Sequence, residues 1–76
     1  MENKNKILTA LGQRIASERK KRGITLEKLA YEMEISKGNL SDIENGKKDP
    51  RYTTLMAIAN GLETTVAKLL REPLEK

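Results

Sequence analysis

Hydrophobic residues recur at the three- and four-residue spacing of amphipathic helices along most of the chain. The first segment with this spacing begins near residues 4–7 and extends to Arg22. Its apolar stripe consists of Ile7, Leu8, Leu11 and Ile15. Gly23 follows, and glycine is common where a helix ends in a left-handed residue. The pattern therefore predicts a long first helix that stops at Gly23.

Two short helices are predicted in the stretch 24–46, and each is opened by a hydroxyl residue. Thr25 is suited to cap a helix over 26–33, and Ser36 to cap another over 37–44. The inward residues of the two helices are Leu26, Leu29, Ala30, Met33, Leu40 and Ile43. The other faces of the second helix carry Lys37, Gly38, Asn39, Ser41 and Asp42. A short helix with a small polar surface, held by its neighbour, is typical of helices that enter the DNA major groove.

A polar turn and a fourth helix follow. Asn45 and Gly46 form a strong turn signal, and the loop 47–51 contains Pro50. The next apolar pattern predicts a helix over about 52–60, with Gly61 as its stop. Its inward residues are Leu55, Ile58 and Ala59.

A fifth helix is predicted to start at a cap formed by Thr64 or Thr65 and to end before Pro73. The chain shows no strand-like alternation, internal repeat or low-complexity tract. The pattern as a whole predicts an all-α, compact five-helix bundle.

Composition narrows the chemistry. Seventy-six residues make one small domain, and the chain contains no Cys, His, Trp or Phe. Thiolate metal sites and disulfides are therefore excluded, and the commonest acid/base group is missing. We expect no cofactor, no metal site and no enzymatic activity. Nothing approaches the ~20 apolar residues of a membrane span, and the N-terminus does not resemble a signal peptide, so a cytoplasmic protein with no membrane partner is expected.

The charge is compatible with a polyanionic partner but also with an ordinary solvated surface. Fifteen Lys and Arg against eleven Asp and Glu give a net charge of +4. The basic cluster at 19–22 ends the first helix, where the helix dipole favours cations in any case. A second cluster, formed by Lys47, Lys48 and Arg51, lies in a loop and lacks that structural explanation.

A set of positions spread over the chain matches a known pattern. They are Gly12, Ile15, Arg19, Gly23, Ile24, Thr25, Leu29, Ala30, Ile35, Ser36, Leu40, Ser41, Ile43, Glu44, Asn45, Gly46, Pro50, Leu55, Ile58, Ala59 and Leu62. Their order and spacing resemble the Cro/CI-type (XRE family) helix-turn-helix domain, which occurs in phage repressors and in restriction–modification controller proteins. The resemblance implies a lambda-repressor-like DNA-binding domain over 7–71, with an N-terminal arm at 1–6 and a C-terminal tail at 72–76.

The resemblance also implies structural roles. Arg19 and Glu44 would form an ion pair that fixes the angle of the recognition helix, the alternative being an exposed pair that contributes little. Ala30 would be the small residue at the crossing of the two motif helices. The chain departs from the family pattern at three positions. Leu26 replaces the usual Gln, Glu34 replaces the usual turn Gly, and Lys28 stands where a capping-box Glu would lie.

Contacts with a double-stranded DNA operator follow from the chemistry of the exposed side chains. Lys37 can donate to guanine, and Asn39 can pair with adenine, with Gly38 and Ser41 between the reading positions. Asp42 either accepts from cytosine N4 or faces solvent and pairs with a lysine or arginine. Phosphate contacts are predicted for Thr25, Ser36, Asn45, Lys47, Lys48 and Arg51, with Lys4 and Lys6 as an arm.

The predicted function is a sequence-specific transcriptional regulator that binds a pseudo-palindromic operator as a homodimer. A dimer interface is predicted at Leu62, Val66, Leu69 and Leu70, the alternative being that these residues, with Leu74, complete the core of one chain. The competing function is an antitoxin-like or antirepressor module that binds a partner protein, with secondary DNA binding. No small-molecule ligand is implied.

Overall fold

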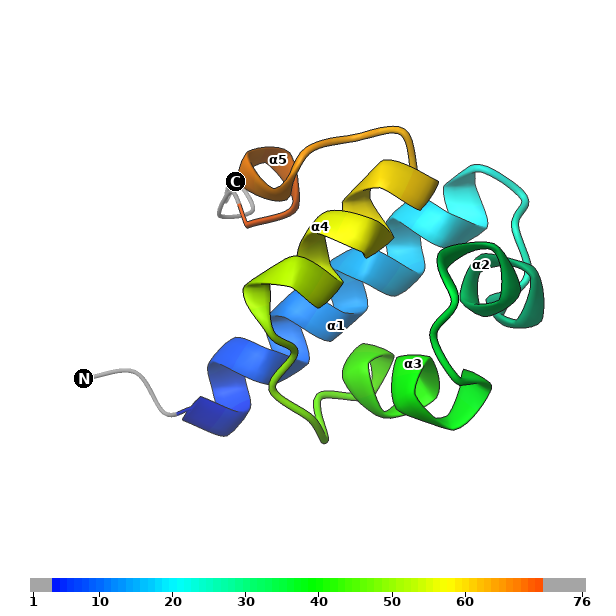
Figure 1. Cartoon of the computed structure of the whole chain (residues 1–76). Coiled ribbons are helices and arrows are strands. Elements are labelled where there is room, and N and C mark those ends of the chain that lie inside the picture. The colour runs from blue at the N-terminus through cyan, green and yellow to red at the C-terminus, as the bar shows by residue number, and fades with distance from the viewer. Residues whose placement is uncertain (1–3, 71–76) are drawn as a thin grey trace.

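Five helices and no strand make up residues 4–70, the part of the chain that the computed structural model describes (Figure 1). They are α1 (Lys4–Lys21), α2 (Leu26–Met33), α3 (Lys37–Glu44), α4 (Tyr52–Gly61) and α5 (Val66–Leu70). The all-α five-helix prediction is confirmed. The predicted tail at 72–76, Leu74 and the stop before Pro73 lie outside the described residues.

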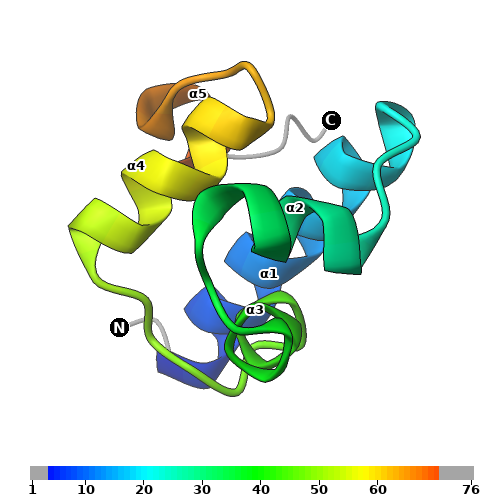
Figure 2. The same cartoon turned by 45° about the vertical axis from the view of Figure 1, so that its right-hand side comes forward.

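The helices close a ring around one small core. In the ring, α1 contacts α3, α3 contacts α2, α2 contacts α4, α4 contacts α5, and α5 returns to α1. Figure 2 shows the turned view, in which α3 and α5 lie at opposite ends of the molecule. The fully buried side chains come from all five helices and the α4–α5 turn: Ile15, Leu29, Leu40, Ile43, Ile58, Leu62 and Leu69. Because each helix contacts two neighbours, α3 is held by both α1 and α2.

One hydrogen-bonded turn ends each of the first four helices. A left-handed residue donates its N–H to the carbonyl three residues earlier, and the next residue donates to the carbonyl five residues before it. The left-handed residues are Gly23, Glu34, Gly46 and Glu63. The predicted stop at Gly61 is therefore wrong, because Gly61 is the last residue of α4 and Glu63 makes the turn. Gly61 serves packing instead, since a Cβ there would lie 2.7 Å from Leu29 Cδ1.

Helix α1 begins at Lys4, within the predicted range of 4–7, but the predicted arm and apolar stripe differ from the structure at this end. Residues 4–6 are helical, so they do not form an extended arm, and residues 1–3 lie outside the described part. Ile7, predicted to face the core, is 52% exposed. The physical reason is length: eighteen residues make a helix of about 27 Å, which extends beyond the shorter helices packed against it.

Within residues 4–70, the helices are too short or too polar to cross a lipid bilayer.

Candidate nucleic-acid interface

Helix α3 is seated by an unusually close approach to α1. A Cβ placed on Gly12 would overlap the backbone carbonyl oxygens of Ile43 and Glu44, so only glycine fits at this crossing. Leu40 and Ile43 are buried on the inner side of α3. The C-terminal half of α3 is therefore fixed against the core. Sequence reasoning placed Gly12 in a pattern but gave it no role, although a glycine inside a helix is a signal of close packing.

The predicted ion pair between Arg19 and Glu44 is present. Arg19 Nε donates to Glu44 Oε2 at 2.8 Å, and Nη2 donates to Oε1 at 3.0 Å. Only 11% and 8% of the two side chains are exposed. The third guanidinium nitrogen, Nη1, donates to the carbonyl of Ile24 at 2.9 Å. The hydrogen bond and charge of Glu44 raise the pKa of Arg19. The pair thus joins α1, the α1–α2 turn and the end of α3.

Both motif helices begin with the predicted hydroxyl caps. Thr25 Oγ1 accepts from the Lys28 N–H at 3.0 Å, and Ser36 Oγ accepts from the Asn39 N–H at the same distance. Each hydroxyl retains its own hydrogen, which can be donated to a phosphate oxygen. The earlier N–H groups of each helix have no intrahelical partner. The first turns of α2 and of α3 can therefore each accept an anion.

The five predicted base-reading residues line the start and outer side of α3. Lys37 and Gly38 are exposed, and Asn39, Ser41 and Asp42 are half-buried. A Cβ on Gly38 would meet nothing within 4 Å, so this position leaves open space. Asn39 Oδ1 is buried without a hydrogen-bond partner. Among the described residues no lysine or arginine pairs with Asp42, so the alternative of a local ion pair is not found.

One contact of this surface was not anticipated. Lys37 Nζ lies 2.8 Å from Glu27 Oε2, and both side chains are exposed. The Lys37 hydrogen bond is the largest cause that lowers the pKa of Glu27. No sequence spacing signals this contact, because it depends on the angle between α2 and α3.

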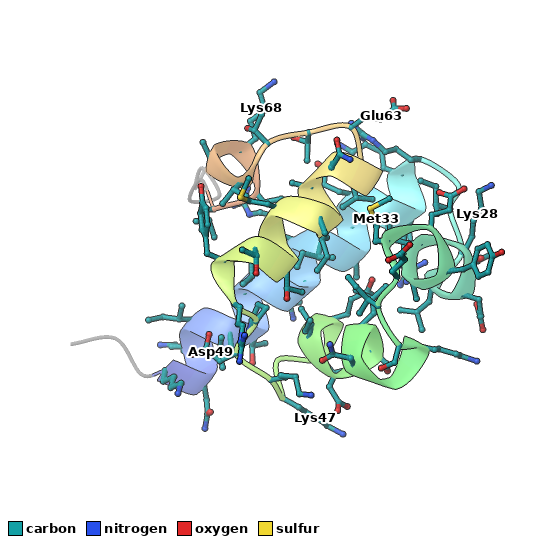
Figure 3. All side chains as sticks on the ribbon, in the orientation of Figure 1. Lys28, Met33, Lys47, Asp49, Glu63 and Lys68 are labelled. Atoms are coloured by element: carbon teal, nitrogen blue, oxygen red, sulfur yellow. The ribbon has the colours of Figure 1, made fainter. Side chains whose placement is uncertain are left out.

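The basic loop after α3 keeps its cations available. Lys47, Lys48 and Arg51 are exposed, and none of them forms an ion pair with another residue of the described range. Figure 3 shows Lys47 projecting away from the body beside α3. Asn45 is also exposed, and its Nδ2 donates to the Ser41 carbonyl at 2.9 Å and contacts Ser41 Oγ at 3.4 Å. The phosphate contact of Asn45 stays a prediction.

The predicted dimer residues do not share one surface. Leu62 and Leu69 are 0% and 2% exposed within a single chain, so for these two the prediction is corrected and the alternative of core packing holds. The reason is that α5 packs against both α1 and α4. Val66 is half-buried, and Leu70 is 51% exposed. Of the four predicted dimer residues, Val66 and Leu70 are the two that retain exposed surface for a partner.

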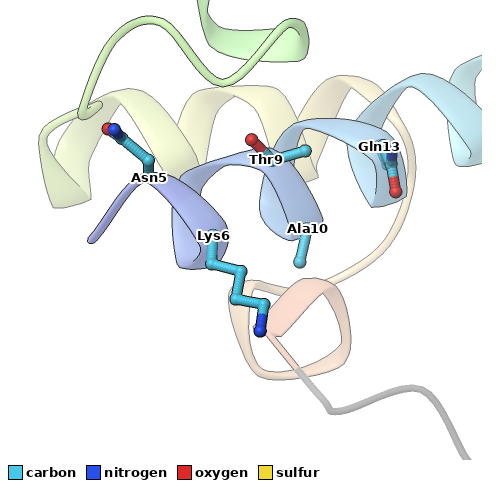
Figure 4. A pocket seen from close by; sticks show the side chains of 5 residues that line it. All are labelled: Asn5, Lys6, Thr9, Ala10 and Gln13. Atoms are coloured by element: carbon cyan, nitrogen blue, oxygen red, sulfur yellow. The ribbon is translucent and has the colours of Figure 1, made fainter. Parts of the chain in front are cut away.

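The hollows on the described surface differ in how many charged groups line them. The one in Figure 4 has a volume of about 670 Å³ and is lined along one side of α1 by Asn5, Lys6, Thr9, Ala10 and Gln13. Its single charged group is Lys6. Within residues 4–70 no three carboxylate, His or Cys side chains gather where they could hold a metal ion.

Comparison with known proteins identifies the fold that holds this surface. Residues 15–69 match the helix-turn-helix family HTH_3. The chain belongs to this family. Over 62 residues, the HTH_3 chain is 37% identical to the immunity repressor protein of Bacillus phage phi105, covering 82% of this chain and 43% of that protein. It therefore spans less than half the length of that relative.

Solved structures of other proteins have the same fold. The HTH_3 chain superposes on the clp gene regulator ClgR from C. glutamicum with a TM-score of 0.82 and 34% identity, covering 84% of this chain and 82% of the other. The restriction-modification controller protein C.AhdI from Aeromonas hydrophila gives a TM-score of 0.80 at 22% identity, covering 82% and 94%, and supports the fold alone. The resemblance to the Cro/CI-type (XRE family) domain is thus confirmed. These relatives are regulators and a repressor, which are not enzymes.

Proposed function

We propose that this HTH_3 chain is a sequence-specific transcriptional regulator that places α3 in the major groove of a pseudo-palindromic operator and binds it as a homodimer. The observation that carries the proposal is the seating of α3. Its inner side is buried and its C-terminal end is fixed by the Arg19–Glu44 pair, while its first residues are exposed. A helix held at one end and open at the other can enter a groove without unfolding its neighbours. We expect the chain to bind this operator in the cytoplasm.

Base reading is assigned to residues that project from α3. Lys37 donates to guanine O6 or N7, and the unpaired carboxylate of Asp42 accepts from cytosine N4. Gly38 allows close approach to the groove floor. Asn39 reads adenine after a rotamer change, because bidentate pairing needs the amide oxygen and nitrogen together and Oδ1 is buried in the free chain. The rotamer change breaks no hydrogen bond of Asn39 Oδ1, because this oxygen has no partner in the free chain.

Phosphate contacts surround the reading surface. The capped starts of α2 and α3 lie next to one another, and Lys47, Lys48 and Arg51 supply charge from the following loop. Three unpaired cations in each chain give six in a homodimer, and release of the corresponding counterions sets a slope of about −5 for log K against log salt.

The homodimer is proposed to use the surface between α4 and α5. A hollow there is lined by Tyr52, Met56, Val66 and Ala67, among others, and Leu70 is exposed on the same short helix. The same apolar surface supports the second candidate, an antitoxin-like or antirepressor module that binds another protein there.

DNA selection tests the proposed function. The full chain would be incubated with a random duplex library, and its affinity for selected and random duplexes measured at two salt concentrations. We expect a selected sequence with two half-sites about 10 base pairs apart, and a steep loss of affinity with salt. If no sequence outcompetes random DNA, the regulator proposal fails and the protein-interaction module becomes the better description.

A pair of lysine variants tests how the contacts are assigned. Lys37→Ala should relax base preference at one position of each half-site, at a cost of about 1–3 kcal/mol on the preferred sequence only. Lys47→Ala should weaken binding to all sequences alike and reduce the salt slope by about 1 per chain. A sequence-selective loss in Lys47→Ala would show that the two sets of contacts are wrongly assigned.

A further inference from the structure

One ion pair bridges the starts of the two motif helices. Glu27 is the second residue of α2, Lys37 is the first residue of α3, and their charged atoms are 2.8 Å apart. The other ion pair of α2, between Lys28 and Glu32 at 3.3 Å, stays within that helix. Among the described residues, the Glu27–Lys37 pair is therefore the ion pair that joins α2 to the first residue of α3.

A lysine at this place without a partner would bind phosphate rather than a base. Its ammonium is a point charge on a flexible stem, and phosphate oxygens attract it at every DNA sequence alike. Contacts of that kind raise affinity without discrimination. A carboxylate at 2.8 Å supplies an anion within the protein, so the lysine gains less by turning toward a phosphate.

The bond to Glu27 still leaves Lys37 able to read a base. An ammonium has three hydrogens, and one of them is directed at Glu27 Oε2. The other two can be donated to guanine O6 and N7, whereas adenine presents N7 beside an amino donor and cytosine presents an amino donor. The carboxylate itself is repelled by phosphates, which lowers binding to any sequence that does not use the lysine.

We propose that Glu27 is a positioning residue that holds Lys37 away from phosphates and directed at a base, and so determines specificity. The inference rests on the DNA-reading role proposed above for α3. Specificity is the difference between the affinities for the operator and for other DNA. It increases when the non-specific complex is weakened as well as when the specific complex is strengthened.

A matched pair of variants tests the proposal. Glu27→Gln and Glu32→Gln each remove one negative charge from α2, but only the first breaks the bond to α3. Affinity would be measured for the selected operator and for a random duplex over a range of salt concentrations. For Glu27→Gln, we expect the ratio of the two affinities to fall roughly tenfold. Its salt slope on random DNA should steepen by about 0.9 per chain, because Lys37 now reaches a phosphate.

Glu32→Gln should change the ratio by less than about twofold, because an exposed pair within one helix has little effect. Equal changes in the two variants would show that Glu27 acts only through net charge, and would overturn the inference. In a Lys37→Met background, Glu27→Gln should no longer lower the ratio. If it still does, Glu27 does not act through Lys37 and the inference is overturned.

A second measurement tests the pair in the DNA-free chain. Because Lys37 lowers the pKa of Glu27, Lys37→Met should raise that pKa toward its ordinary value of 4.5, as followed by carboxyl carbon shifts in NMR. An unchanged titration would show that the pair does not form in solution and would overturn the inference. If the wild-type chain shows no sequence preference, the proposed function is overturned. If the wild type is selective but Glu27→Gln has the same ratio of operator to random-duplex affinity, only the inference is overturned.

Discussion

At the scale of single residues, two glutamates occupy a conformation that favours glycine. Glu34 and Glu63 have φ angles of 58° and 57°, close to those of Gly23 and Gly46 at the equivalent turns of α1 and α3. The hydrogen bonds of the four turns are the same. The strain in the two glutamate turns is therefore sustained by the surrounding structure, at a cost of about 1 kcal/mol for each residue.

Replacing Glu34 with glycine should stabilise the fold. We expect Glu34→Gly to raise the free energy of unfolding by about 0.5–1 kcal/mol, because relief of the left-handed strain exceeds the entropic cost of glycine. The corresponding rise in Tm is roughly 3–6 °C. Glu32→Gly is the matched control: it removes the same side chain inside α2 and should destabilise by about 0.5–1 kcal/mol. Destabilisation by both variants would contradict the assignment of strain to Glu34.

The orphaned oxygen of Asn39 predicts a separation of stability from binding. Asn39→Ala removes a buried acceptor that has no partner, so the free energy of unfolding should not fall and should rise by up to about 1 kcal/mol. The same variant should lose base preference worth about 1–3 kcal/mol. Asn60→Ala, on the exposed side of α4, measures the helix-propensity effect of this substitution. If Asn39→Ala is less stable than Asn60→Ala in urea unfolding, the oxygen has a partner in solution.

At the scale of the elements, the orientation of α3 depends on one close crossing and one ion pair. Gly12 permits the backbone contact, and the Arg19–Glu44 pair joins the two helices near the same place. Such a pair is costly to break from one side, because the remaining charge stays largely shielded from water. The helix proposed to read DNA is thus fixed by residues outside the proposed DNA contacts.

Glu44→Gln should therefore cost far more than a comparable change at the surface. We expect a loss of about 1.5–3 kcal/mol in the free energy of unfolding, measured in urea. Glu18→Gln is the control, since Glu18 accepts from Arg22 at 3.0 Å in a more exposed pair and should cost less than about 0.5 kcal/mol. Equal costs for the two variants would show that the buried pair contributes no more than a surface pair.

Local signals fixed most of what could be predicted about the elements. The caps at Thr25 and Ser36 depend on hydrogen bonds that span three residues, so the sequence contains all of their information. The Arg19–Glu44 pair, 25 residues apart, was accessible only through the family resemblance. The Glu27–Lys37 contact could not be predicted, because it depends on the relative placement of helices rather than on spacing.

At the scale of the whole molecule, the size of the described domain can be compared with the proposed operator. The longest extent of the domain is 35 Å, about the distance of 34–36 Å between the centres of two half-sites. On the proposed operator, one copy would span one half-site, and a second copy would read the other. The proposed homodimer would have to form away from Leu62 and Leu69, because both are buried in the core of a single chain.

The surface between α4 and α5 is the better candidate, and a charge placed there should separate the copies. We expect Leu70→Glu to weaken dimerisation roughly 10–30-fold in sedimentation equilibrium, because an apolar anchor would be replaced by a desolvated carboxylate. Operator affinity should fall with it, while binding to an isolated half-site should persist. Tyr31→Glu is the control, because Tyr31 is 85% exposed on α2, which Figure 1 shows on the other side of the molecule from α5. If both variants sediment like the wild type, the copies meet elsewhere or the chain acts as a monomer, and the apolar surface is then free for the partner of an interaction module.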